Sequence, residues 1–300
     1  MVLRGRGRRG AATVLTIGMI FTIAVIRANG QRHADRSSSV PQEDEAMKIT
    51  VCEFPDDTAA MAPAWDHLAT TLAAAPTDLL VLPELVASGS FWAQPVFDAA
   101  VWRDAVARHE DLSKQFERLA ARRILGTRAI ETGGQRLNES FLWTPARGMV
   151  PGRAKAWLPQ QEGGWEATWF DRAPPVVDVV DDDGLRFAML ICSEVQVSPA
   201  PRALGQGGVQ LIAVPRATGG HHRWEVATRM AAIAAGAFVA SANRRGDNPA
   251  AGNFAGSSWI IGPDGDELAR TDAAHPVVTV EIDLALADAA KLTYPRNVAD

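Results

Sequence analysis

From residue 48 onward the chain switches repeatedly between the two hydrophobic periods that mark strands and helices. Residues 48–54 alternate as a first strand does. Residues 58–75 carry apolar side chains three and four positions apart, as on the buried face of a helix. Residues 79–82 are continuously apolar, which is typical of a strand buried on both faces. The chain is therefore predicted to begin its fold as strand, helix, buried strand.

The same alternation continues through the rest of the chain. It predicts helices at 101–122 and 224–235. Strands are predicted at 123–131, 138–144, 176–180, 186–191, 209–214, 238–242, 257–261 and 277–282. The turn residues at 181–184 predict a hairpin between the third and fourth of these strands. Because residues 47–300 show neither a break in composition nor a fixed-period repeat, we expect a single α/β domain.

The first 46 residues differ from the rest of the chain. Arginines at positions 4, 6, 8 and 9 precede an uncharged run over 10–26, and residues 31–46 are polar, as in a linker. The basic start and apolar run are typical of a secretion signal or a membrane anchor. Alternatively, Met47 is the true start and the protein is cytoplasmic, since Met47 directly precedes the first predicted strand. Both interpretations treat 1–46 as an extension of the 47–300 domain.

Composition and charge exclude several classes of protein. The 300 residues are 47% hydrophobic and 22% charged, which is typical of a globular chain rather than a disordered or polytopic membrane protein. The net charge is −5, and the extension carries +3 of it, so residues 47–300 carry −8 and lack the basic surface of a nucleic-acid binder. Only 2 cysteines are present, so we expect neither a disulfide framework nor a structural zinc site.

Reactive side chains follow two of the predicted strands. Glu84 comes just after the strand at 79–82, and Cys192 directly follows the strand at 186–191. Lys155 lies ahead of a loop broken by Pro159. A cysteine thiol needs a base to become a nucleophile, and the oxyanion formed by its attack needs a positive donor. A carboxylate, an ammonium and a thiol in one chain therefore suggest acyl-transfer chemistry.

The segments around these residues resemble the Glu, Lys and Cys signatures of the carbon–nitrogen hydrolase (nitrilase) superfamily, in the same order. They are Pro83-Glu84-Leu85, Lys155-Ala156-Trp157-Leu158-Pro159 and Ile191-Cys192-Ser193-Glu194. The resemblance covers 47–300. It implies a four-layer α-β-β-α sandwich and hydrolysis of a non-peptide C–N bond without a metal or organic cofactor. It also implies that Glu84, Lys155 and Cys192 are catalytic, with Ser193 supplying a backbone N–H to the oxyanion.

The family has a second glutamate between its lysine and its cysteine. Glu166 begins a run that ends in an aromatic residue, as in the family, and is the preferred candidate. Glu162 is the alternative. Three nearby tryptophans, Trp157, Trp165 and Trp169, are candidates for the wall of a substrate pocket. Packing in the core or at a dimer interface is the alternative for them.

The residues after Cys192 bear on the substrate. True nitrilases usually have Trp-Glu-Asn there, whereas this chain has Ser193-Glu194-Val195, which favours a small amide or carbamoyl substrate. Nitrile hydrolysis, acyl transfer to an amine and a non-catalytic binding role remain alternatives. The adjacent His221 and His222 have no metal-ligand spacing and are expected in a polar loop. We expect a homodimer or higher homo-oligomer, with a membrane as partner only if 1–46 is a real anchor.

Overall fold

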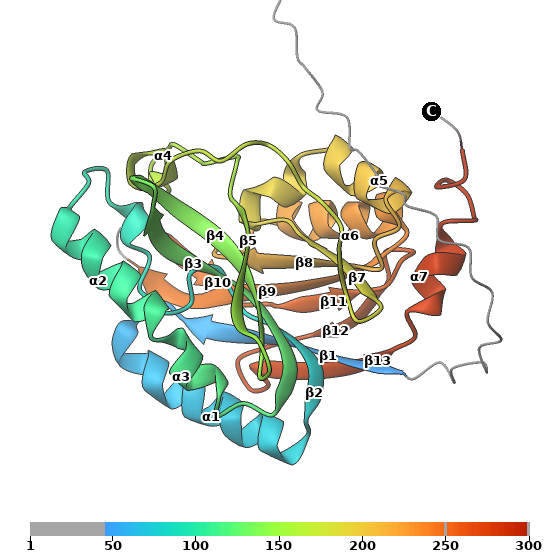
Figure 1. Ribbon diagram of the computed structural model, residues 1–300, viewed down its shortest axis with the longest axis horizontal. Coiled ribbons are helices and arrows are strands. Elements are labelled where there is room, and N and C mark those ends of the chain that lie inside the picture. Colours follow the sequence, from blue (N-terminus) through green and yellow to red (C-terminus); the bar gives the residue numbers. More distant parts are fainter. Residues whose placement is uncertain (1–45, 249–250, 299–300) are drawn as a thin grey trace, which may run out of the picture.

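The computed structural model describes residues 46–248 and 251–298 (Figure 1). The predictions for the N-terminal extension therefore lie, apart from residue 46, outside the described residues. The strands are β1 (Met47–Pro55), β2 (Thr77–Val81), β3 (Ala121–Thr132), β4 (Gln135–Thr144), β5 (Gly148–Ala154), β6 (Val180–Asp182), β7 (Leu185–Met189), β8 (Leu211–Arg216), β9 (Phe238–Asn248), β10 (Gly252–Ala255), β11 (Trp259–Ile261), β12 (Glu267–Arg270) and β13 (Val277–Ile282). The helices are α1 (Met61–Ala74), α2 (Ala99–Glu110), α3 (Leu112–Phe116), α4 (Glu166–Trp169), α5 (Pro199–Gln206), α6 (Arg223–Ala235) and α7 (Ala285–Ala290).

The strands form one curled, 13-stranded sheet with β1 near its middle. The main order is β5-β4-β3-β2-β1-β9-β8-β7-β6, and β13 pairs with β1 while β10 and β11 pair with β9. β1 runs parallel to β2 along one stretch and parallel to β9 at its C-terminal end. The prediction of a single mixed α/β domain is confirmed. The four separate layers implied by the resemblance stay a prediction, because β1 joins both halves of the sheet.

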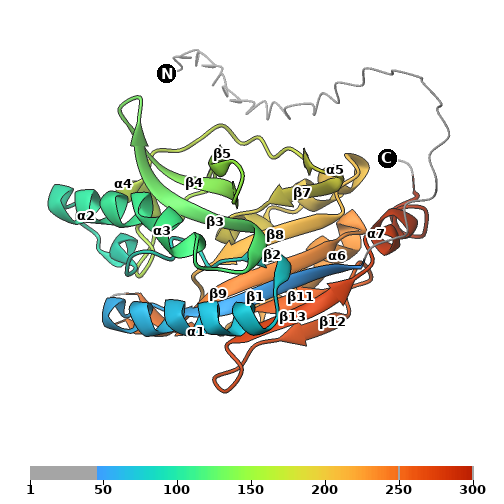
Figure 2. The same ribbon diagram turned by 60° about the horizontal axis from the view of Figure 1, so that its bottom comes forward.

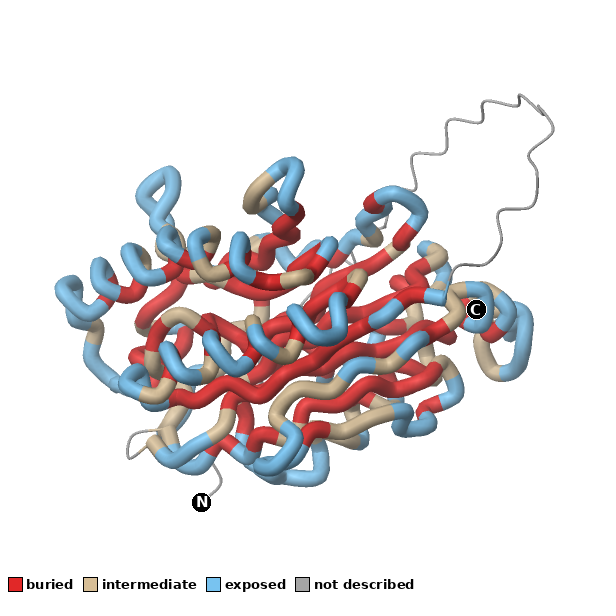
Figure 3. The backbone as a smooth tube through the Cα atoms, turned by 90° about the horizontal axis from the view of Figure 1, so that it is seen from below, coloured by how far each residue is buried: buried red, intermediate tan, exposed pale blue. Residues whose placement is uncertain are grey.

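Hydrophobic clusters explain how the sheet and helices pack. One cluster joins the facing sides of the two halves of the sheet, with members from β1 and β2 and from β7, β8 and β9. A second lies between α1, α3 and strands β1 to β4, and a third between α5, α6 and strands β7 to β9. Figures 1 and 2 show α1 to α3 beside one half of the sheet and α5 and α6 beside the other. In Figure 3 the central strands are buried and the exposed backbone lies in the surrounding helices and loops.

Some predicted elements differ from the observed ones. The single helix predicted at 101–122 is wrong, because α2 and α3 are separated by Asp111 and β3 already begins at Ala121. Leu112 and Phe116 of α3 are buried, so the apolar spacing continues across the break. The predicted hairpin exists, but β6 begins only at Val180 and the turn is Asp183-Gly184, both with positive φ, as a two-residue hairpin turn requires.

Several short elements have no counterpart in the predictions. They are β5, β10, β12, α4, α5 and α7. β5 is exposed to half-buried along its whole length and so lacks a continuous hydrophobic signal. Within the described part of the chain no helix is long and apolar enough to cross a membrane.

Candidate active site

Three strand ends carry the predicted catalytic side chains. Glu84 follows β2, Lys155 comes directly after β5, and Cys192 follows β7 at the start of a short 3₁₀ turn. All three residues are buried, with exposed fractions of 1%, 1% and 5%. Removing charged and nucleophilic groups from water is costly unless they are paired, so their burial together points to a chemical role.

Lys155 lies between two carboxylates. Its Nζ donates hydrogen bonds to Oε1 of Glu84 and to Oε1 of Glu166, both at 2.8 Å. Burial lowers the pKa of Lys155, but the charges of Glu166 and Glu84 outweigh burial and raise the pKa above its ordinary value. Lys155 is therefore a cation across the physiological pH range.

Glu84 is positioned by a second residue that sequence reasoning missed. Asn138 is buried in β4, and its side-chain Nδ2 donates to Oε1 of Glu84 at 2.8 Å. The backbone carbonyl of Asn138 accepts the backbone N–H of Lys155, also at 2.8 Å. The other oxygen of Glu84, Oε2, is buried and has no hydrogen-bond partner among the described residues. With Oε1 occupied by two donors, Oε2 is the oxygen of Glu84 that can take up a proton.

The structure distinguishes between the two candidates for the second glutamate. Glu166 is buried at the start of α4, and its Oε2 lies 2.7 Å from Nζ of Lys155. Glu162 is exposed, beside the bridge between Gln161 and Gly164, and has no contact with Lys155. Burial raises the pKa of Glu166, against the opposing effect of the Lys155 charge. Of the two candidates, Glu166 is therefore the one that lies next to Lys155.

Cys192 has a backbone conformation that is unusual for a residue with a side chain. Its φ is 51°, in the left-handed region, and Leu85 directly after Glu84 has a φ of 50°. Such conformations persist only where the surroundings impose them, and they concentrate at functional sites. Burial and the charge of Glu84 raise the pKa of the Cys192 thiol, while Lys155 and a backbone hydrogen bond from Ala217 lower it. Since the pKa stays above its usual value, the resting side chain is a thiol that needs a base.

Two contacts tie the Cys192 turn to the segment that carries Lys155. The Ser193 hydroxyl donates to the carbonyl of Trp157 at 2.9 Å. The fully buried Glu194 carboxylate accepts the backbone N–H groups of Ala156 at 2.8 Å and Ile191 at 2.9 Å. From the sequence, Glu194 is only a member of the motif that contains Cys192. The structure makes its side chain a link between the two segments.

The three predicted pocket tryptophans lie in different surroundings. Trp169 is fully buried in an aromatic cluster with Phe91 and donates from its indole N–H to the carbonyl of Gln94 at 2.8 Å, so it packs the core rather than lining a pocket. Trp157 is half-buried against the α5–α6 side, and Trp165 is half-buried at the start of α4. A pocket role for Trp157 and Trp165 stays a prediction.

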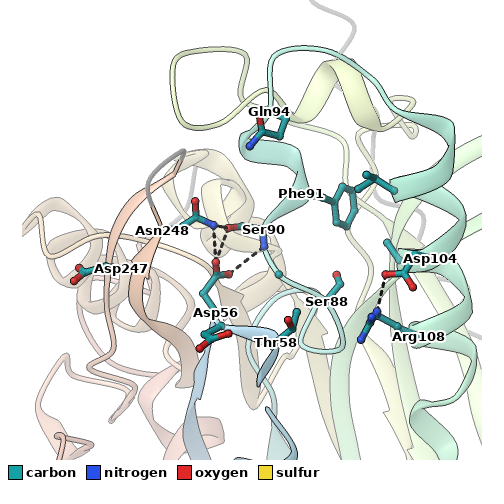
Figure 4. Close-up of a pocket in the computed structure, with 14 residues that line it drawn as sticks. Asp56, Thr58, Ser88, Ser90, Phe91, Gln94, Asp104, Arg108, Asp247 and Asn248 are labelled. Atoms are coloured by element: carbon teal, nitrogen blue, oxygen red, sulfur yellow. Dashed lines mark hydrogen bonds and ion pairs between the residues drawn. The ribbon is translucent and has the colours of Figure 1, made fainter. Parts of the chain in front are cut away.

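A cavity of about 480 Å³ lies beside the loop that follows β2 (Figure 4). It is lined by Asp56 and Ser90, whose side chains bond each other, and by Asn248, which bonds both. The buried Arg244 connects Asp56 to the catalytic loop by donating to the carbonyl of Glu84 at 2.9 Å. None of Glu84, Lys155 and Cys192 lines this cavity, so it is separate from the cluster that those three residues form.

His221 and His222 lie on the surface, away from the buried cluster of Glu84, Lys155 and Cys192. His221 and His222 are exposed and stack on each other with ring centroids 4.5 Å apart, as expected for a polar loop. Within residues 46–248 and 251–298, no group of three or more His, Cys, Asp or Glu side chains is arranged to hold a metal ion.

The chain is similar to known carbon–nitrogen hydrolases in sequence. The carbon-nitrogen hydrolase family model matches residues 46–292. The chloroplastic omega-amidase of Arabidopsis thaliana is 27% identical over 122 residues, which are 40% of this chain and 33% of the plant protein. The match thus spans about a third of that relative's length.

Solved structures show the same fold. The carbon-nitrogen hydrolase of Helicobacter pylori superposes with a TM-score of 0.74 at 19% identity, covering 85% of this chain and 94% of that one. A CN-hydrolase superfamily protein of Xanthomonas campestris gives a TM-score of 0.68 at 22% identity, covering 84% and 96%. An amidase of Nesterenkonia gives 0.65 at 21% identity, covering 81% and 92%. The fold and the match of the family model to residues 46–292 establish that the chain belongs to the carbon–nitrogen hydrolase family.

Proposed function

We propose that this protein is an amidase that hydrolyses the C–N bond of a small amide through a thioester on Cys192. The observation that carries the proposal is the placement of the fully buried Lys155 ammonium between Glu84 and Glu166. Both carboxylates and the ammonium act electrostatically on Cys192. A base, a positive donor and a thiol in one buried cluster are the groups that acyl transfer needs.

In the first half-reaction, Oε2 of Glu84 accepts the thiol proton and the sulfur attacks the amide carbonyl carbon. Lys155 and the backbone N–H of Ser193 stabilise the oxyanion of the tetrahedral intermediate. The C–N bond then breaks as Glu84 returns the proton to the leaving nitrogen, so that ammonia or an amine departs. The acyl group stays on sulfur as a thioester.

In the second half-reaction, Glu84 takes a proton from water, and the hydroxide attacks the thioester carbonyl. The C–S bond breaks, the carboxylic acid is released, and the sulfur regains its proton from Glu84. Glu166 holds the Lys155 ammonium in place through both steps.

Amides are preferred over nitriles because Ser193 stands where true nitrilases usually have tryptophan. The similarity to an omega-amidase favours testing ω-amides first, in which the amide and a carboxylate are at opposite ends of the molecule.

Ammonia release from a panel of ω-amides, aliphatic amides, carbamoyl compounds and the matching nitriles tests the proposal. We expect turnover of at least one amide, none of its nitrile, and loss of turnover in Cys192→Ala. Turnover confined to nitriles, or an active Cys192→Ala protein, would contradict it.

A further inference from the structure

Arg216, the last residue of β8, is a buried cation without a carboxylate partner among the described residues. Its exposed fraction is 1%. Its guanidinium donates to Oγ of Ser241 at 2.6 Å, to Oγ1 of Thr218 at 2.8 Å and to the carbonyl of Ser257 at 2.8 Å, and these partners are all neutral. Burying a charge without an opposite charge is costly, so the position of Arg216 calls for a reason.

Arg244, a second fully buried arginine, differs from Arg216 in having a carboxylate partner. Arg244 also donates to backbone carbonyls, but it is paired with the carboxylate of Asp56 at 2.8 Å. Arg216 has no such carboxylate among the described residues. Its guanidinium carbon lies instead 3.9 Å from the centroid of the Trp259 ring. A ring face stabilises a cation less than a carboxylate does, and it leaves the positive charge uncancelled.

The backbone of Arg216 lies beside both Glu84 and Cys192. The peptide unit between Arg216 and Ala217 accepts the N–H of Glu84 at 3.3 Å through its carbonyl. Through its N–H, the same unit hydrogen-bonds Cys192. Since β8 is parallel to both β7 and β9, its carboxyl end meets the same edge of the sheet as the strand that leads to Cys192.

A second cation near Cys192 would offset the negative charge around its thiol. The thiol is faced by Glu84 beyond β2, Glu166 on α4 and Lys155 beyond β5. While both carboxylates are ionised they share a single ammonium, so the sum of the three charges is negative and opposes loss of the thiol proton to solvent. Burial lowers the pKa of Arg216 to about 9, while the charge of Cys192 raises it, so the two groups interact electrostatically.

We propose that Arg216 is a positioning residue whose uncancelled charge stabilises the Cys192 thiolate and thereby sets the pH range in which the nucleophile forms. This inference rests on Cys192 being the nucleophile proposed above. Arg216 acts through the thiolate and need not touch the substrate, so its effect can be measured without one.

The experiment follows the alkylation of Cys192 by iodoacetamide from pH 6 to pH 10. The rate is read from the mass of the peptide that contains Cys192, which separates it from the buried Cys52. In Arg216→Gln the profile of log rate against pH should be displaced upward in pH by about one unit or more, so that alkylation at neutral pH slows about tenfold or more. Arg216→Lys supplies a cation of different shape, and at pH 6 to 7, where its ammonium is protonated, alkylation should proceed within about threefold of the unaltered rate.

Two further variants keep the test decisive. Arg216→Met is a second neutral substitution that adds no buried donor, and it should shift the profile as Arg216→Gln does. Arg270→Gln is the control, because the Arg270 guanidinium also lies near Trp259, 5.0 Å from the ring centroid. Arg270 is already paired with Glu225 and Glu267, so this variant should leave the alkylation profile of Cys192 unchanged.

An unshifted profile in a folded neutral variant would overturn the proposal. Equal shifts in the glutamine and lysine variants would also overturn it, because they would trace the effect to packing rather than charge. If neither neutral variant shows a native circular dichroism spectrum, the test rests on Arg216→Lys. An alkylation rate at pH 6 to 7 that is tenfold or more below that of the unaltered protein would then count against the role of charge. A silent amide assay combined with the expected shifts would refute the proposed function alone.

Discussion

Arg153 and Glu194 form an ion pair across the site, with Nη2 of Arg153 at 2.8 Å from Oε1 of Glu194. Arg153 lies in β5, two residues before Lys155, and Glu194 lies two residues after Cys192. The Glu194 side chain is fully buried and that of Arg153 is 15% exposed. One carboxylate therefore fastens the segment that carries the ammonium to the turn that carries the thiol.

The first prediction concerns this ion pair. Glu194→Gln should lower the free energy of unfolding by about 3 kcal/mol, because it leaves the partly buried Arg153 guanidinium without its counter-charge. It should also reduce kcat, since the Lys155 and Cys192 segments lose their common anchor. Glu162→Gln is the control, because an exposed carboxylate outside the site should change the stability by less than about 0.5 kcal/mol. Urea unfolding of the two variants is the measurement, and equal midpoints would contradict the anchoring role.

A second prediction separates a lysine mechanism from a cysteine–histidine one. Lys155→Ala should lower kcat by roughly two to three powers of ten, as loss of an oxyanion donor does. Lys155→Arg should fail as well, because a planar guanidinium does not fit between Glu84 and Glu166 as a compact ammonium does. Changing His221 and His222 together to Ala is the control and should have little effect. A larger loss in the double histidine variant than in Lys155→Ala would rule the assignment out.

A third prediction concerns Asn138. Asn138→Ala removes one of the two donors to Oε1 of Glu84, so kcat should fall about tenfold to a hundredfold, as expected for a hydrogen bond to a charged group. KM should change little, because Asn138 acts through Glu84. Steady-state kinetics with one amide substrate checks this, and an effect confined to KM would argue against it.

A fourth prediction concerns acid stability. Burial raises the pKa of Asp182, but hydrogen bonds from Arg123 and Arg147 outweigh burial and hold the pKa below its usual value. The folded state therefore binds this proton less readily than the unfolded chain does. The stabilisation is present above the unfolded pKa of about 4 and is lost as the pH falls through the folded value.

Urea unfolding between pH 7 and pH 2 measures this dependence. Asp182→Asn should be less stable than the unaltered protein at pH 7, and the difference should shrink as the pH approaches 2. The exposed Asp178→Asn is the control and should follow the unaltered protein. A difference that stays constant over the whole range would exclude the role of ionisation.

The sequence predicted the parts of the site that carry strong local signals. Glu84 and Cys192 each follow a continuous apolar strand, and Lys155 stands in a motif of its own. Asn138 gave no such signal, because it is a polar residue within a strand and its partner is far away in the sequence. Asn138 meets Glu84 across 54 positions, a pairing that depends on how the strands assemble.

The same limit applies to the fold. Hydrophobic spacing located α1 and α6 well, because each buries one face against the sheet. It did not reveal the break at Asp111, since α2 and α3 both bury apolar side chains and the spacing runs on. It also missed β5, whose place is set by pairing with β4 rather than by burial.

The central claim is that Cys192 carries the acyl group during turnover. The most direct measurement is the mass of the peptide containing Cys192 after a turning-over mixture of enzyme and amide is quenched in acid within milliseconds to seconds. The account predicts an added mass equal to that of the substrate's acyl group, which disappears when the substrate is exhausted and never forms in Cys192→Ala. Steady amide turnover with an unmodified Cys192 peptide at every time point, and with undiminished activity in Cys192→Ala, would contradict it.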